Sequence, residues 1–129
     1  MSAKNNYLRK LARVMSEDTR YDPEAYFFIH RALEFLLRGM KERRHVSGQE
    51  LLEGIRRYAL REFGPMSRDV LKYWGVRRCE DFGEMVFNMV DNGLLKKTPE
   101  DSKDDFRAGF DFREAFDKPF RPSSRPRKK

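Results

Sequence analysis

The stretch from residue 47 to residue 93, SGQELLEGIRRYALREFGPMSRDVLKYWGVRRCEDFGEMVFNMVDNG, decides the fold class. Apolar residues recur in it with helical spacing, and Gly-Pro and Gly interrupt the pattern twice. The pattern predicts helices over residues 47–63, 67–74 and 79–92. Ser47 with Glu50 has the spacing of a capping box, and Ser67 is expected to cap the second helix. Trp74 is expected to be buried against the first of these helices.

Downstream of this stretch the apolar period changes. Residues 94–98 are short and begin apolar, and residues 106–112 alternate Phe or Ala with polar residues and glycine. Such alternation is typical of a half-buried strand, so the two segments predict a β-hairpin. A second interpretation stays open, in which Asp111 and Glu114 cap a single turn that holds Phe112 against Phe116.

Upstream, apolar residues predict helices over residues 4–15 and 23–41, the second one started by Asp22 and Pro23. Three helices followed by a hairpin are the element order of a winged helix. The predicted fold class is therefore mainly α with a small C-terminal β-hairpin, a winged-helix-like core preceded by two helices. Residues 1–117 are expected to form this single domain.

The charge of the chain is concentrated at its C-terminus. The net charge is +7, and residues 118–129 (KPFRPSSRPRKK) hold six of the 28 Lys and Arg residues and no acid. The remaining 117 residues carry 22 basic and 21 acidic side chains, so the body is nearly neutral. Pro and Ser interrupt the basic segment and leave it nothing to build a core from, so residues 118–129 are predicted to be a disordered basic tail.

Six strings of residues resemble a conserved, uncharacterised bacterial protein family of similar length, of the kind found in planctomycete and verrucomicrobial genomes. The strings, in chain order, are DPEAYFF, HVSGQELLEGIR, VLKYWGV, DFGEMVFNMV, GLLKKT and DFRAGFDF. The resemblance covers roughly residues 7–116 and leaves out the tail. It implies a bacterial cytosolic protein and carries no activity, ligand or site residue with it.

Few residues of the chain suggest chemistry. One cysteine, Cys79, and two histidines, His30 and His45, do not have the spacing of a metal site, and no phosphate-binding glycine loop or nucleophile elbow is present. The acidic group at residues 100–105 lacks the glycine and the distal Glu of a calcium loop, and is interpreted as a solvated hairpin turn. We therefore predict no catalytic, cofactor or metal site, and no enzyme.

Sequence-specific DNA binding is also not expected. The third helix of a winged helix reads the major groove, and residues 79–92 contain four acidic residues and no Lys or Arg. Basic residues do recur on the preceding segments, at positions 56, 57, 72, 77 and 78. They are interpreted either as separate solvated faces or as one stripe.

Two functions remain. The first prediction is a non-enzymatic protein-interaction or adaptor module with a protein partner. The alternative is non-specific association with RNA or DNA through the cations of the tail, which are Lys118, Arg121, Arg125, Arg127, Lys128 and Lys129. The longest apolar run, residues 25–29, is too short to span a membrane, and a lone cysteine suits a reducing compartment, so a cytoplasmic location is predicted.

Overall fold

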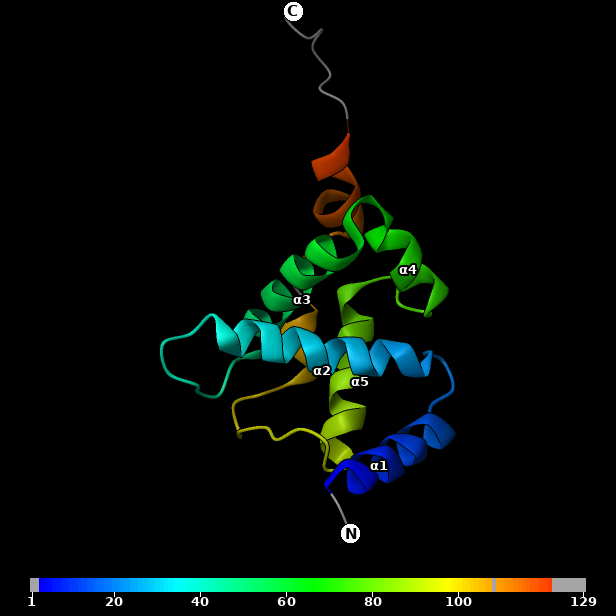
Figure 1. Ribbon diagram of the computed structural model, residues 1–129, viewed down its shortest axis with the longest axis vertical. Coiled ribbons are helices and arrows are strands. Elements are labelled where there is room, and N and C mark those ends of the chain that lie inside the picture. Colours follow the sequence, from blue (N-terminus) through cyan, green and yellow to red (C-terminus); the bar gives the residue numbers. More distant parts are fainter. Residues whose placement is uncertain (1–2, 108, 122–129) are drawn as a thin grey trace, which may run out of the picture.

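The structure is a computed structural model that describes residues 3–107 and 109–121. Its longer helices are α1 (Ala3–Glu17), α2 (Pro23–Arg38), α3 (Gly48–Phe63), α4 (Ser67–Tyr73) and α5 (Cys79–Asp91). Four short turns complete the described elements: 3₁₀ turns η1 (Gly64–Met66), η2 (Lys103–Phe106) and η4 (Lys118–Phe120), and the π-helical turn η3 (Arg113–Asp117). Helix α2 packs on α3, and α1 lies at the opposite end of the molecule from η3 and η4 (Figure 1).

The predicted helix starts at Asp22 and Ser47 are confirmed. The Asp22 carboxylate accepts the backbone N–H of Glu24 at 2.8 Å, with Pro23 in the first turn of α2. At α3, Ser47 Oγ accepts the N–H of Glu50 at 3.1 Å, and the Glu50 carboxylate accepts the N–H of Ser47 at 2.9 Å. This reciprocal pair satisfies two amides that the helix itself leaves without partners.

We expect Ser47→Ala to lower the free energy of unfolding by about 1 kcal/mol, because the variant leaves a helix amide without its acceptor. Urea denaturation monitored by circular dichroism measures this change. Ser16→Ala is a suitable control, since the exposed Ser16 hydroxyl only donates to the carbonyl of Arg13 within α1, and it should stay within about 0.5 kcal/mol of wild type. Equal losses in the two variants would contradict a capping role for Ser47.

The predicted role of Ser67 as a helix cap is wrong. Its side chain is fully buried, and its hydroxyl hydrogen-bonds the carbonyl oxygens of Ala59 at 3.0 Å and Gly64 at 2.7 Å. Ser67 therefore ties the start of α4 back to the end of α3. Trp74 is half-buried, with its ring 5.6 Å from Phe28 and 5.7 Å from Phe63, so it packs on α2 and on the last turn of α3.

The predicted C-terminal β-hairpin is wrong, and with it the winged-helix-like core, because residues 3–107 and 109–121 contain no strand. The backbone amides that a first strand would use are taken up locally. The N–H groups of Leu94 and Leu95 both donate to the carbonyl of Met89 and close the end of α5. Downstream, Ser102 caps the 3₁₀ turn η2 by accepting the N–H of Asp104 at 3.1 Å.

The aromatic side chains of the alternating segment 106–112 are buried or half-buried although its described residues form no strand. Phe106 and Phe112 are buried and Phe110 is half-buried, whereas Arg107 and Asp111 are exposed. The aromatic side chains thus face the helices from an irregular segment. An alternating pattern of apolar and polar residues predicts which side chains face inward. A loop that lies along the core can have the same pattern as a strand.

The second interpretation of this segment, a single capped turn, is confirmed. The Asp111 carboxylate accepts the N–H of Glu114 at 3.1 Å, and the rings of Phe112 and Phe116 meet edge to face at 5.1 Å. Phe116 is fully buried. The C-terminal segment is therefore part of the core.

The predicted tail begins inside the described residues. Lys118–Phe120 form the turn η4, and Arg121 is exposed. Residues 122–129, and with them four of the six tail cations, lie outside the described part of the chain. Figure 1 shows that η3 and η4 lie beside the end of α3, so the tail starts at this end of the molecule.

Candidate nucleic-acid interface

Five arginines surround one hollow on the surface. Segments far apart in sequence contribute them, namely the start of α4, the loop before α5 and the segment that leads into η3; the residues are Arg68, Arg77, Arg78, Arg107 and Arg113. The hollow has a volume of about 360 Å³, and its acidic lining residues are Glu80 and Asp111. The hollow is therefore polar, and its charge is positive.

Two of these arginines are committed to carboxylates and three are not. Arg68 pairs with Asp117 at 2.7 Å, and Arg107 pairs with Asp104 at 3.2 Å. Among the described residues, no carboxylate lies within 4 Å of the guanidinium nitrogens of the other three, which are Arg77, Arg78 and Arg113. These three side chains are exposed and keep their donors for an external anion.

A second hollow adjoins the first, since Arg77 and Arg78 line both. Its other lining residues come from the loop between α1 and α2, the turn after α4 and the first turn of α5, and they are Arg20, Tyr21, Gly75 and Asp81. Its volume is about 580 Å³. We call the six arginines of the two hollows, Arg20, Arg68, Arg77, Arg78, Arg107 and Arg113, the arginine belt.

Asp81 lines the second hollow and its oxygens accept three hydrogen bonds. Its carboxylate accepts the Tyr21 hydroxyl at 2.7 Å and the backbone N–H groups of Arg77 at 2.9 Å and Arg78 at 3.3 Å. Burial, and then this carboxylate, raise the pKa of Tyr21, so its hydroxyl stays protonated and donates. Asp81 thus fixes the backbone of Arg77 and Arg78 through their amides and leaves their guanidiniums free.

The two loops that form the second hollow touch at Gly75. The N–H of Asp22 donates to the carbonyl of Trp74 at 3.0 Å. Gly75 has a φ of 90°, and a Cβ there would collide with the carbonyl oxygen of Arg20. Only glycine combines this conformation with so close an approach. Arg20 is held by Asp18 at 2.6 Å and by Glu84 at 3.1 Å, and its hydrogen bond to Asp18 lowers the pKa of that carboxyl.

Of the stripe considered from the sequence, only part lines the two hollows. Arg56 is paired with Glu53, and Arg57 lies over the ring of Phe35 at 5.6 Å, so both are engaged on α3. Only Arg77 and Arg78 of that set belong to the belt. Sequence reasoning did not single out Arg20, Arg107 or Arg113, because each stands alone in its own segment and only the fold brings them to the hollows.

The tail residues predicted to bind nucleic acid are only partly described. Lys118 pairs with Glu114 at 3.2 Å on the surface, and Arg121 is exposed. The other four, Arg125, Arg127, Lys128 and Lys129, lie outside the described residues. Because Asp117 is bound by Arg68, the residue just before the tail is attached to the rim of the first hollow.

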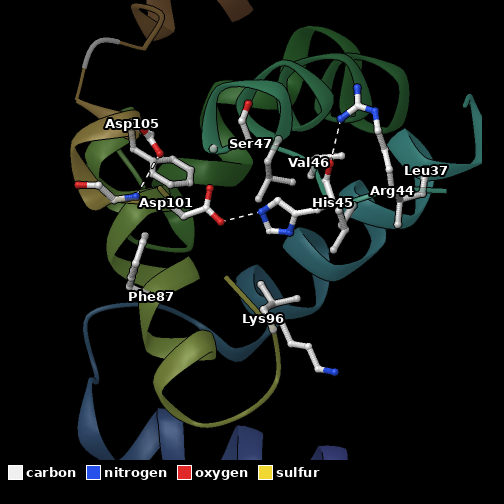
Figure 2. Close-up of a pocket in the computed structure, with 15 residues that line it drawn as sticks. Leu37, Arg44, His45, Val46, Ser47, Phe87, Lys96, Asp101 and Asp105 are labelled. Atoms are coloured by element: carbon white, nitrogen blue, oxygen red, sulfur yellow. Dashed lines mark hydrogen bonds and ion pairs between the residues drawn. The ribbon is translucent and has the colours of Figure 1, made fainter. Parts of the chain in front are cut away.

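A separate, mostly apolar pocket lies between α2, the start of α3 and the segment after α5 (Figure 2). Its volume is about 230 Å³, and its apolar lining is formed by Leu33, Leu37, Val46, Leu51, Phe87, Leu95 and Phe106. At one edge His45 Nε2 lies 2.6 Å from an Asp101 carboxylate oxygen. Figure 2 shows the two side chains facing each other and the amine of Lys96 pointing away.

The sequence did not foresee the contact between His45 and Asp101, since the histidine was interpreted as isolated. Burial alone raises the pKa of Asp101, but hydrogen bonds from the Thr98 N–H and from His45 outweigh it, and the net shift is downward. Neighbouring hydroxyls are used elsewhere: Ser47 Oγ accepts from Glu50, and Ser102 Oγ accepts from Asp104. No described hydrogen bond joins a serine to His45, so a nucleophile–base–acid arrangement is not assembled here.

Cys79 lines the first hollow with a buried, protonated thiol. It is buried, its thiol donates to the carbonyl of Phe110 at 3.3 Å, and burial raises its pKa to about 12. We expect no reaction of the native protein with an aromatic disulfide reagent near pH 8, because the thiolate is the reacting form. The same assay in urea should titrate the thiol fully. Rapid reaction of the native protein would show that residues 109–112 do not cover Cys79.

Among the described residues, no helix is both long and apolar enough to cross a membrane. The chain matches no family model, no curated protein and no solved structure. The resemblance to an uncharacterised bacterial family therefore stays a prediction.

Proposed function

We propose that this protein binds nucleic acid without catalysis, through the arginine belt of its body together with its basic tail. A guanidinium presents a planar fork of N–H donors that matches phosphate oxygens, and it stays charged at every physiological pH. The observation that carries the proposal is the group of three exposed arginines, Arg77, Arg78 and Arg113, without carboxylate partners at one hollow.

The belt is built to keep these charges in place. The backbone of Arg77 and Arg78 is anchored through Asp81, and Arg68 is fixed by Asp117. A backbone that is already fixed loses little conformational entropy when an anion binds, and this favours affinity. The tail leaves from the same region, so a polyanion held by the tail has a high effective concentration at the belt.

This proposal changes the order of the two predicted functions. From the sequence, a protein-interaction module came first and nucleic-acid association through the tail came second. The net charge of residues 1–117 is close to zero. The fold gathers six arginines on one side, and this supports a nucleic-acid surface on the body as well. A cytoplasmic location remains part of the proposal, because a lone reduced thiol suits that compartment.

The protein-interaction module stays the second candidate, and one observation favours it. Met66 in η1 and Phe120 in η4 are 56% and 45% exposed, and both turns pack on η3. Exposed apolar side chains near one another are typical of surfaces that bind proteins. If this candidate is right, a Met66→Ser/Phe120→Ser double variant will lose its partner in affinity purification, whereas reversal of belt charges will retain it.

The test of the first candidate compares two charge reversals of equal size. Arg77→Glu/Arg78→Glu reverses two belt charges. Lys41→Glu/Lys96→Glu reverses two exposed charges that line neither hollow of the belt. Fluorescence anisotropy with a labelled oligonucleotide at low salt gives the affinities. We expect a loss of roughly tenfold or more in the belt variant, because phosphate contacts dominate such binding. The control, with the same net charge, should lose less than about threefold.

Equal losses in both variants would overturn the proposal, since only net charge would then matter. Two glutamine variants control for misfolding caused by the new glutamates. They are Arg77→Gln/Arg78→Gln and Lys41→Gln/Lys96→Gln. They remove the charges without introducing new ones, and the amides bound by Asp81 are unchanged in them. Circular dichroism confirms that each variant is folded before its affinity is compared.

A further inference from the structure

Tyr73 is the most exposed of the described large apolar side chains, with 84% of its surface accessible. It ends α4, and its neighbour Trp74 turns inward onto Phe28 and Phe63. No described ring contact or hydrogen bond involves the Tyr73 side chain. The fold therefore makes no use of this ring, which stands in solvent on a backbone that is held in place.

Tyr73 is close to the second hollow of the belt. It precedes Gly75, which lines that hollow, by two residues, so their Cα atoms lie within about 7.6 Å of each other. The cationic residues of the hollow are Arg20, Arg77 and Arg78. The bond from the Asp22 N–H to the Trp74 carbonyl fixes this corner. An exposed aromatic residue thus ends the helix from which the chain runs directly into the hollow that Arg77 and Arg78 line.

The shape of the belt favours a single strand over a duplex. Reading of a duplex groove needs a protruding helix or ribbon with basic side chains. Helix α5 starts at the belt, but its residues CEDFGEMVFNMVD contain no Lys or Arg, and its Phe82, Met85, Val86 and Met89 are buried. The belt offers concave hollows instead, which suit flexible phosphates and splayed bases.

We infer that the second hollow and Tyr73 bind single-stranded nucleic acid, with phosphates on Arg77 and Arg78 and a base stacked on the Tyr73 ring. This inference rests on the proposed function and specifies its ligand. Proteins that bind single strands combine two features. Basic side chains contact the phosphates of the nucleic acid, and an aromatic ring stacks on a base. Stacking tolerates any base, so the site needs no sequence preference.

The experiment compares a ligand with bases and one without. Binding of oligo-dT, oligo-U and inorganic polyphosphate is measured for wild type, Tyr73→Ala and Tyr73→Phe. We expect Tyr73→Ala to weaken oligonucleotide binding roughly 5- to 100-fold and to leave polyphosphate binding unchanged. Tyr73→Phe keeps the ring and should bind as wild type does. Met66→Ala, which removes another exposed apolar side chain, is the control and should bind oligonucleotides normally.

The outcomes separate this inference from the proposed function. If Tyr73→Ala binds oligo-dT and oligo-U as tightly as wild type, the stacking role is wrong, and the belt is still tested by Arg77→Gln/Arg78→Gln. If Tyr73→Ala weakens polyphosphate equally, the residue acts on the arginines and not on a base, which also overturns the inference. A duplex of the same length that competes as well as the single strand would overturn the single-strand preference.

Discussion

Phe106→Ala is expected to lower the free energy of unfolding by about 3–5 kcal/mol. The Phe106 ring is 2% exposed and fills a slot between the start of α3 and the first turns of α5. A Cβ at Gly48 would lie 3.0 Å from Phe106 Cε1, and one at Gly83 would lie 3.0 Å from Phe106 Cβ. Two glycines on different helices therefore make room for one ring. Its removal leaves a cavity that these helices can fill only by moving.

A matched control is available in the same part of the chain. Phe120 is 45% exposed, so Phe120→Ala should change the free energy of unfolding by less than about 1 kcal/mol. Urea denaturation of both variants measures the difference. A loss in Phe106→Ala no larger than that in Phe120→Ala would show that residues 103–106 do not pack between α3 and α5. Because small domains are stable by only about 5–15 kcal/mol, the expected loss is a large part of the total.

Phe106 also shows what the sequence could and could not predict. Its place in an alternating row correctly predicts that it faces inward, as do Phe110 and Phe112. The element type was wrong, because Ser102, with its hydrogen bond to Asp104, starts a 3₁₀ turn at this point. Burial follows from the hydrophobic pattern, whereas backbone conformation depends on local hydrogen bonds that short polar side chains decide.

The helices were predictable for the same physical reason. The starts of α2 and α3 carry side chains that act within three residues, Asp22 and Ser47, so the sequence alone contains both partners. Ser67 was misread, because its hydroxyl bonds a carbonyl eight residues earlier, at Ala59. A serine that caps a helix and a buried serine that bonds a distant carbonyl look the same in the sequence. Only the packing of α4 on α3 shows which role Ser67 has.

The candidate site was the least predictable part. Arg20 and Arg113 are far apart in sequence and come to neighbouring hollows only through the fold. His45 and Asp101 likewise meet across two loops. No pattern of neighbouring residues in the sequence indicates that these residues come together. The tail cations, in contrast, are recognisable from composition alone, because a run without acids keeps its charge whatever its conformation.

The salt dependence of binding separates the tail from the belt. Each phosphate contact on a single strand contributes about −0.7 to the slope of log K against log salt. Six tail cations therefore contribute about −4, and three unpaired belt arginines contribute about −2. The whole protein should show a slope near −6. From the tail alone, affinity should fall roughly 300-fold between about 50 and 200 mM salt.

Replacing the six tail cations with glutamine should therefore change the slope from about −6 to about −2. Substitution is better than deletion here, because the chain keeps the turn η4 and Phe120. The melting temperature should stay within about two degrees of wild type, since exposed ion pairs such as Lys118 with Glu114 stabilise little. Oligonucleotide affinities across a salt series give both slopes.

A slope near zero in the substituted protein would show that the belt makes no phosphate contact, and an unchanged slope would show that the tail makes none. A slope near −2 that Arg77→Gln/Arg78→Gln then reduces by about 1.4 units would assign the remaining contacts to the belt.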